Sequence, residues 1–189
     1  MPAFPKPIQL SHLLIGQIVH TADIVVDATL GNGHDALFLA RLIGEKGVVY
    51  GFDVQEEAIQ SSTELMQKNA INNKNYRFLH AGHEKMSSHV NGEVSVIMFN
   101  LGYLPSADKS VITTEATTLI ALEQALHLLK VEGLVSIMCY PGHDGGDKEA
   151  DAVRKWCSEL ARESYRVVEY GLLNAPNNPP FLILIEKTK

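Results

Sequence analysis

Two acidic residues and a glycine-rich turn are the strongest chemical signal in the sequence. Asp27 ends an apolar run, and residues 31–36, GNGHDA, fit the pattern G-x-G-x-x-A. Asp53 lies twenty positions after the second glycine of that pattern, Gly33. Glycines allow a tight turn and close approach of the main chain to a ligand, and a carboxylate can accept both hydroxyls of a ribose. The pattern predicts a site for an adenosine-containing ligand, with a binding turn made of Gly31, Asn32, Gly33 and His34.

Asp27 distinguishes between two adenosine cofactors. The pyrophosphate of a nicotinamide dinucleotide would be repelled by a carboxylate four residues before the first glycine, Gly31. The ammonium group of S-adenosylmethionine would be attracted by the same carboxylate. We therefore expect S-adenosylmethionine, with Asp27 at its methionine end and Asp53 at its ribose. The alternatives are a dinucleotide, or a simple glycine turn with a solvated Asp27.

A second polar segment, Asn100–Pro105, follows a strongly apolar run and is the candidate acceptor site. The amide oxygen of Asn100 can orient an attacking nitrogen, and the ring of Tyr103 can stack on a base. His143, in the segment YPGHDGGD, is a candidate proton acceptor or substrate contact. The alternatives are that Asn100 only shapes a turn and that His143 is a loop histidine without a role.

Three histidines, His80, His83 and His89, lie close together in the segment HAGHEKMSSH. Their spacing is not an established pattern of metal ligands, and no further cysteine or acid repeat accompanies them. We expect Gly82 and His83 to line the adenine end of the donor pocket, and we expect no metal.

Apolar periodicity predicts the strands and helices that position these residues. The predicted strands are residues 24–27, 47–53, 76–80, 94–100, 133–140, 165–172 and 181–187. The predicted helices are residues 9–20, 34–43, 55–70 and 147–162, with one more that begins after Thr113 or Thr114. Because parallel neighbours need crossover connections, the alternation predicts an α/β, Rossmann-like fold with helices on both faces of a seven-stranded, mostly parallel sheet. The last two strands lack a helix between them, so the last one is expected to be antiparallel. Nearly all the candidate residues then lie beyond the carboxyl ends of strands, where such sheets bind ligands.

Length and composition predict one soluble domain over residues 1–189, with residues 1–20 as an N-terminal arm and helix. No apolar run approaches the roughly 20 residues needed to span a bilayer, and the N-terminus lacks the pattern of a signal peptide. We therefore expect a cytoplasmic location and no membrane association. The net charge of −6 argues against a broad, nonspecific nucleic-acid surface, although a local basic patch remains open.

The sequence resembles the class I S-adenosylmethionine-dependent methyltransferases along nearly its whole length, and more narrowly the bacterial rRNA methylase (YtqB-like) family. The resemblance rests on the segments DATLGNGHD, FDVQ, AGHE, NLGYLP and YPGH followed by GGD. It implies methylation of the aminomethyl nitrogen of 5-aminomethyl(-2-thio)uridine at the tRNA wobble position (MnmM-type activity), contact with the anticodon region, and a homodimer. The alternatives are an rRNA or small-molecule amine N-methyltransferase, or a non-catalytic protein that binds S-adenosylmethionine.

The resemblance also assigns roles to individual residues. It places Asp53 and Gln55 at the ribose and adenine, and Gly82 with His83 at the adenine flank. Residues 100–105 stand where many amino-group methyltransferases have Asn-Pro-Pro-Tyr, and they keep the asparagine but not the prolines that follow it. The donor-binding turn matches the family at Asp27, Gly31, Asn32 and Gly33.

Overall fold

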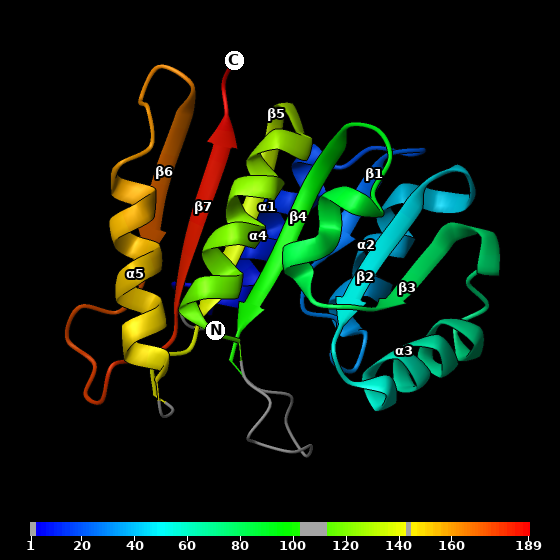
Figure 1. Cartoon of the computed structure of the whole chain (residues 1–189), viewed down its shortest axis with the longest axis horizontal. Helices are drawn as coiled ribbons and strands as arrows, with labels where there is room; N and C mark the ends of the chain where they lie inside the picture. The colour runs from blue at the N-terminus through cyan, green and yellow to red at the C-terminus, as the bar shows by residue number, and fades with distance from the viewer. Residues whose placement is uncertain (1–2, 103–112, 143–144) are drawn as a thin grey trace.

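A seven-stranded sheet forms the centre of the computed structural model, which describes residues 3–102, 113–142 and 145–189. Its strands are β1 (Ile24–Asp27), β2 (Val48–Asp53), β3 (Tyr76–His80), β4 (Val94–Leu101), β5 (Leu129–Cys139), β6 (Tyr165–Tyr170) and β7 (Phe181–Lys187). They are ordered β3-β2-β1-β4-β5-β7-β6 across the sheet (Figure 1). Neighbours from β3 to β5 pair in parallel, whereas β7 lies antiparallel between β5 and β6. The predicted mostly parallel sheet with an antiparallel last strand is confirmed.

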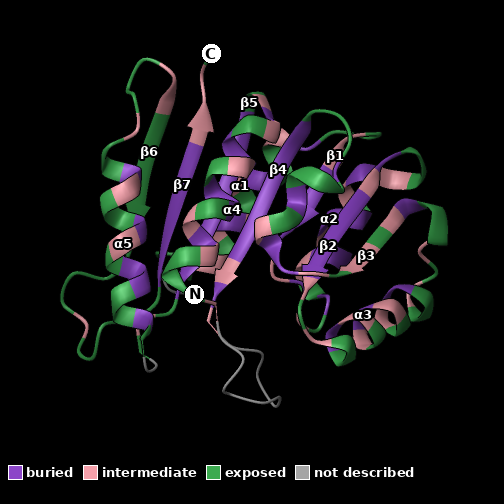
Figure 2. Cartoon of the chain, in the orientation of Figure 1, coloured by how far each residue is buried: buried purple, intermediate pink, exposed green. Residues whose placement is uncertain are grey.

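Helices cover both faces of the sheet. One face packs against α1 (Pro7–Ile18), α2 (His34–Ile43) and α3 (Glu56–Lys68). The other face packs against α4 (Glu115–Leu128), α5 (Gly146–Ser158) and the short 3-10 helix η3 (His83–Ser88). Two further 3-10 turns, η1 (Gly44–Lys46) and η2 (Asn73–Asn75), precede β2 and β3. Figure 2 shows β4 and β7 buried along most of their length, which identifies the middle of the sheet as the core.

Most predicted elements lie within a few residues of the observed ones, and β5 differs most. The prediction began this strand at Gly133. In the structure β5 begins at Leu129, and a register irregularity in its pairing with β4 accommodates the extra residues. Glu132 adopts a positive φ of 66° in this stretch. The 3-10 turns were also missed, since elements of three to six residues leave no periodic pattern.

Gly33 determines how closely the start of α2 approaches α3. Its φ is +76°, and a Cβ atom built there would lie 2.6 Å from Ser62 Oγ and 3.0 Å from Ser62 Cα. Ser62 is itself fixed, because its hydroxyl donates to the carbonyl of Gly31 at 3.0 Å. The glycine turn therefore rests directly on α3.

We expect Gly33→Ala to lower the free energy of unfolding by about 2–4 kcal/mol, through backbone strain and the clash with Ser62. Gly16→Ala is the matched control, because Gly16 lies within α1 and a Cβ there meets nothing within 4 Å. Removing a helical glycine at that site is expected to stabilise the protein by about 0.5–1 kcal/mol. Urea unfolding of both variants measures the difference, and equal midpoints would contradict the packing role of Gly33.

Candidate functional site

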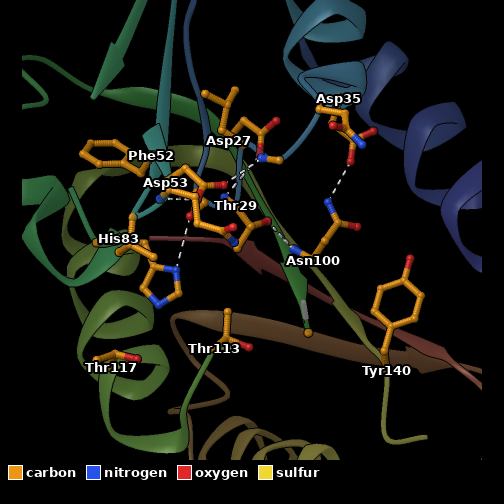
Figure 3. A pocket seen from close by; sticks show the side chains of 18 of the residues that line it. Asp27, Thr29, Asp35, Phe52, Asp53, His83, Asn100, Thr113, Thr117 and Tyr140 are labelled. Atoms are coloured by element: carbon orange, nitrogen blue, oxygen red, sulfur yellow. Dashed lines mark hydrogen bonds between the residues drawn. The ribbon is translucent and has the colours of Figure 1, made fainter. Parts of the chain in front are cut away.

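A cavity of about 810 Å³ opens at the carboxyl ends of the five strands β1 to β5. It lies where the strand order reverses between β1 and β4, the usual ligand position in open α/β sheets. Thr113, just before α4, and Thr117 in its first turn complete one side of the wall (Figure 3). Residues 177–180 of the loop before β7 complete the other. The fold thus brings five strand ends, the N-terminal turns of α2 and α4, and a distant loop around one space.

Asp53 joins two loops on one side of the cavity, the glycine turn after β1 and the loop after β2. Its Oδ2 atom accepts a hydrogen bond from the main-chain N–H of Gly31 at 2.9 Å, and its Oδ1 atom accepts one from Gln55 at 2.9 Å. A carboxylate has about four lone-pair positions, so acceptor capacity remains for hydroxyl groups of a ligand. The geometry fits the ribose role predicted for this residue.

Asp27 is a buried carboxyl group at the end of β1, with a side chain that lines the cavity. Its Oδ1 atom accepts from the N–H of Thr29 at 3.2 Å, while its Oδ2 atom has no hydrogen-bond partner among the described residues. Burial raises the pKa of Asp27 to about 8, and the negative charges of Asp35 and Asp53 add to the effect. A cationic group in the cavity would partner this oxygen and favour its ionised form. The residue therefore fits the ammonium group of S-adenosylmethionine.

Asn100 lies near the end of β4 and is held by both its main chain and its side chain. Its backbone N–H donates to the hydroxyl oxygen of Thr29 at 2.7 Å. Its side-chain nitrogen donates to Asp35 Oδ2 at 2.8 Å, and the other oxygen of Asp35 contacts the ring of His12 at 2.7 Å. The predicted acceptor residue is thus connected to α2 and to α1.

His83 lies in the wall of the cavity at the start of η3. Its Nδ1 atom is 3.2 Å from the carbonyl oxygen of Ala28, which can only accept, so this ring nitrogen carries the hydrogen. Burial lowers the pKa of His83, which favours the neutral ring with Nε2 as an acceptor. Phe99 packs against the ring edge, with centroids 5.8 Å apart. A neutral acceptor flanked by an aromatic ring fits the predicted adenine end.

The other two histidines of the segment HAGHEKMSSH have separate environments. His80 bonds through Nε2 to the carbonyl of Val54 at 2.9 Å, and the His89 ring lies 6.1 Å from that of Phe52. Among the residues that the structure describes, no group of three or more His, Cys, Asp or Glu side chains is placed to hold a metal ion.

The structure brings together most of the residues predicted for the site. Gly33 lies behind the turn against Ser62 and does not line the cavity. Tyr103 and His143 lie outside the described residues. The predicted residues that line the cavity are Asp27, Gly31, Asn32, His34, Asp53, Gln55, Gly82, His83 and Asn100.

Three features of the wall were given no functional role in the sequence analysis. Asp35 was read only as part of the glycine pattern, although its spacing places it on the first turn of α2 facing the cavity. Tyr140 follows directly after β5, and burial raises the pKa of its hydroxyl, with a further contribution from the charge of Asp35. Residues 177–180 come from the hairpin before β7, which has no local pattern that points to a ligand. The strand-end rule had placed Tyr140 at this edge, as the first residue of the segment YPGHDGGD, but no role was assigned to it.

Comparison with known proteins assigns the family. Residues 49–186 match the model of the family described as "Putative rRNA methylase". The chain belongs to this family. Within this rRNA methylase family, a crystal structure from Clostridium thermocellum has a TM-score of 0.95 at 36% identity, and the match covers 98% of this chain and 100% of that one. A "putative methyltransferase" from Streptococcus mutans in complex with SAH, S-adenosylhomocysteine, has a TM-score of 0.89 at 41% identity, over 97% and 99% of the two chains.

A plant protein is also similar to this chain. The chain is 34% identical over 192 aligned positions to the "tRNA (mnm(5)s(2)U34)-methyltransferase, chloroplastic" of Arabidopsis thaliana. The alignment covers 96% of this chain and 70% of the relative. Together these matches identify the chain as a class I methyltransferase that depends on S-adenosylmethionine, as the sequence predicted. Within the described part of the chain, no helix is long and apolar enough to cross a membrane.

Proposed function

We propose that the protein transfers a methyl group from S-adenosylmethionine to the aminomethyl nitrogen of 5-aminomethyl(-2-thio)uridine at the wobble position of tRNA. The observation that carries this proposal is the match to the Arabidopsis thaliana tRNA methyltransferase along 96% of the chain. The cavity supports it, because an acceptor amide lies beside the residues that fit the donor. The competing substrate is rRNA, which the family description names, and the test below distinguishes rRNA from tRNA.

The donor end of the cavity would hold S-adenosylmethionine, which supplies an electrophilic methyl group on its sulfonium. Asp53 would accept the ribose hydroxyls, and Asp27 would bind the ammonium group of the methionine portion. Gln55 would contact the adenosine beside Asp53, and the neutral ring of His83 would accept from the exocyclic amine of adenine. The remaining residues proposed for donor binding are Gly31, Asn32, Gly33, His34 and Gly82.

The acceptor end of the cavity is proposed to orient a nitrogen nucleophile. The Oδ1 atom of Asn100 would accept a hydrogen bond from the reacting amine and hold its lone pair toward the donor. An aliphatic amine has a pKa near that of lysine, about 10, so it must lose a proton before it attacks. Tyr103 and His143 stay in the proposal as the stacking residue and the proton acceptor.

The charge of the cavity limits where the RNA backbone can bind. Among the described residues that line the cavity, none is a lysine or arginine, whereas Asp27, Asp35, Asp53 and Glu84 are acidic. Phosphates would be repelled from this space, so a single extruded base with a cationic amine is the part of an RNA that suits it. We propose that the anticodon backbone contacts surfaces outside the cavity. A single domain over residues 1–189, a homodimer and a cytoplasmic location complete the proposal.

Nucleoside mass spectrometry of tRNA from cells that lack the protein tests the substrate. We expect 5-aminomethyluridine, or its 2-thio form, to accumulate at the expense of the methylated nucleoside. The purified protein with S-adenosylmethionine should then convert this tRNA in vitro and leave rRNA from the same cells unmethylated. An unchanged tRNA profile, or methyl incorporation into rRNA alone, would overturn the wobble assignment.

A further inference from the structure

The side-chain amide of Asn100 has two ends with opposite chemistry. Its oxygen can accept a hydrogen bond from an amine, and its NH2 group can only donate. Rotation of the amide by half a turn would therefore present a donor to the substrate and remove the proposed orienting contact. A catalytic asparagine at this position needs something that distinguishes the two orientations.

Asp35 makes that distinction. Its carboxylate is only an acceptor when ionised, and its Oδ2 atom lies 2.8 Å from the Asn100 side chain. The amide end that faces Asp35 must then be Nδ2, which leaves Oδ1 for the cavity. Figure 3 shows the amide nitrogen of Asn100 pointing at Asp35 and its oxygen turned away, on the side where the Tyr140 ring stands. The hydrogen bond from the Asn100 main chain to Thr29 fixes the base of the same side chain.

His12 fixes Asp35 from the other side. Its Nε2 atom lies 2.7 Å from Asp35 Oδ1, so this ring nitrogen carries the hydrogen and donates it. The His12 ring stacks on Phe38 of α2, with centroids 4.0 Å apart and planes 11° from parallel. Asp35 is mostly buried, with 14% of its side chain exposed, and His12 is 33% exposed. Both oxygens of Asp35 are thus engaged, one by α1 and one by β4.

We propose that Asp35 and His12 are positioning residues, which hold the Asn100 amide with its oxygen toward the acceptor nitrogen. The inference rests on the proposed role of Asn100 in methyl transfer. Asp35 acts through Asn100, because it is the acceptor that orients the Asn100 amide and His12 holds it in place from α1. In this assignment α1, which contributes no residue to the glycine pattern, is part of the catalytic machinery.

The test compares Asp35→Asn with the wild type in methyl transfer to tRNA from cells that lack the protein. An asparagine can either accept from or donate to Asn100, so the amide orientation is no longer enforced. We expect kcat to fall by about 100-fold. The Kd for S-adenosylhomocysteine should stay within about threefold or improve, since removing the charge of Asp35 makes ionisation of Asp27 easier. Glu57→Gln, an exposed acid on α3, is the matched control and should leave both values unchanged.

Two further variants separate positioning from a merely structural effect. His12→Phe can retain the stacking on Phe38 and removes the hydrogen bond, so kcat should fall by about tenfold with donor affinity unchanged. The double variant Asp35→Asn/Asn100→Asp exchanges the two residues. It restores a hydrogen-bond donor at position 35 and an acceptor at position 100, with the same net charge as the wild type. We expect this double variant to recover at least about tenfold of the kcat that Asp35→Asn loses.

The outcomes distinguish this inference from the function on which it rests. If Asn100→Ala is inactive while Asp35→Asn keeps kcat within threefold of the wild type, the positioning role is wrong and the role of Asn100 stands. If Asn100→Ala is fully active, the role of Asn100 fails and the positioning role fails with it. A loss of donor affinity and of thermal stability in Asp35→Asn, without recovery in the exchanged pair, would make Asp35 a structural residue only.

Discussion

Asp53→Ala is expected to abolish donor binding, with the affinity for S-adenosylhomocysteine falling by at least about 100-fold. The lost interactions are charge-assisted hydrogen bonds to ribose hydroxyls, each worth about 1.5–3 kcal/mol. The variant also loses the contacts from Asp53 to the N–H groups of Gly31 and Gln55, which order the two loops at the donor end. Isothermal titration calorimetry measures the affinity, and Glu56→Ala, an exposed acid at the start of α3, is the matched control.

A modified ligand separates the ribose contact from the ordering of the loops. An S-adenosylhomocysteine analogue without ribose hydroxyls should bind the wild type weakly, and Asp53→Ala should weaken its binding much less than that of the natural ligand. If Asp53→Ala binds S-adenosylhomocysteine as the wild type does, the ribose assignment is wrong. An equal loss for both ligands would assign Asp53 to loop structure alone.

Asp27→Asn is expected to weaken donor binding and stabilise the ligand-free protein. The folded-state pKa of about 8 exceeds the ordinary value of 3.8, so between these values the folded state holds a proton that the unfolded state has lost. The free energy of unfolding therefore decreases as pH rises through this window, and the full cost is present above pH 8. Because asparagine does not ionise, the variant should be more stable than the wild type at pH 9, by on the order of a few kcal/mol. Urea unfolding at pH 5 and pH 9 measures the difference, which should be several times smaller at pH 5.

Donor affinity should respond to the same titration with the opposite sign. A bound ammonium group requires the ionised form of Asp27, so binding below pH 8 releases a proton. The affinity of the wild type for S-adenosylhomocysteine should rise by about tenfold between pH 6 and pH 7, and that of Asp27→Asn should change little. Calorimetry in two buffers of different ionisation enthalpy detects the proton release. A wild-type affinity that is flat between pH 6 and pH 8 would contradict the ammonium contact.

The part of the cavity that is proposed to bind the donor could be predicted from the sequence because its signals are local. The strand β1, the glycine turn and helix α2 follow one another in the chain, and their apolar spacing is intact, so β1 and α2 begin and end where they were predicted. Asp53 was identified for the same reason, as an acid at the end of the next strand. Elements that depend on neighbours in sequence are accessible to pattern analysis.

The proposed acceptor side of the cavity depends on contacts between distant segments. The prediction of this side from the sequence was therefore incomplete. The bond between Asp35 and Asn100 joins α2 to β4, and His12 reaches Asp35 from α1. No spacing rule relates these three residues, since their approach follows from how α1 and α2 pack on the same face of the sheet. Tyr140 is a further residue on the cavity wall, and its position follows from the register of β5 beside β4.

The position of β7 in the sheet determines when the sheet and the cavity wall can be completed during translation. Strand β6 pairs with β7 in the sheet, and β7 inserts between β5 and β6, although it is translated last of the strands. A nascent chain that has emerged only as far as β6 contains the loops that carry Asp27 and Asp53, but β5 lacks its neighbour β7. Residues 177–180 precede β7 directly, so this part of the cavity wall takes its place only when β7 docks. This part of the cavity wall is therefore completed after the loops that carry Asp27 and Asp53, and strand β7 closes both the sheet and the cavity.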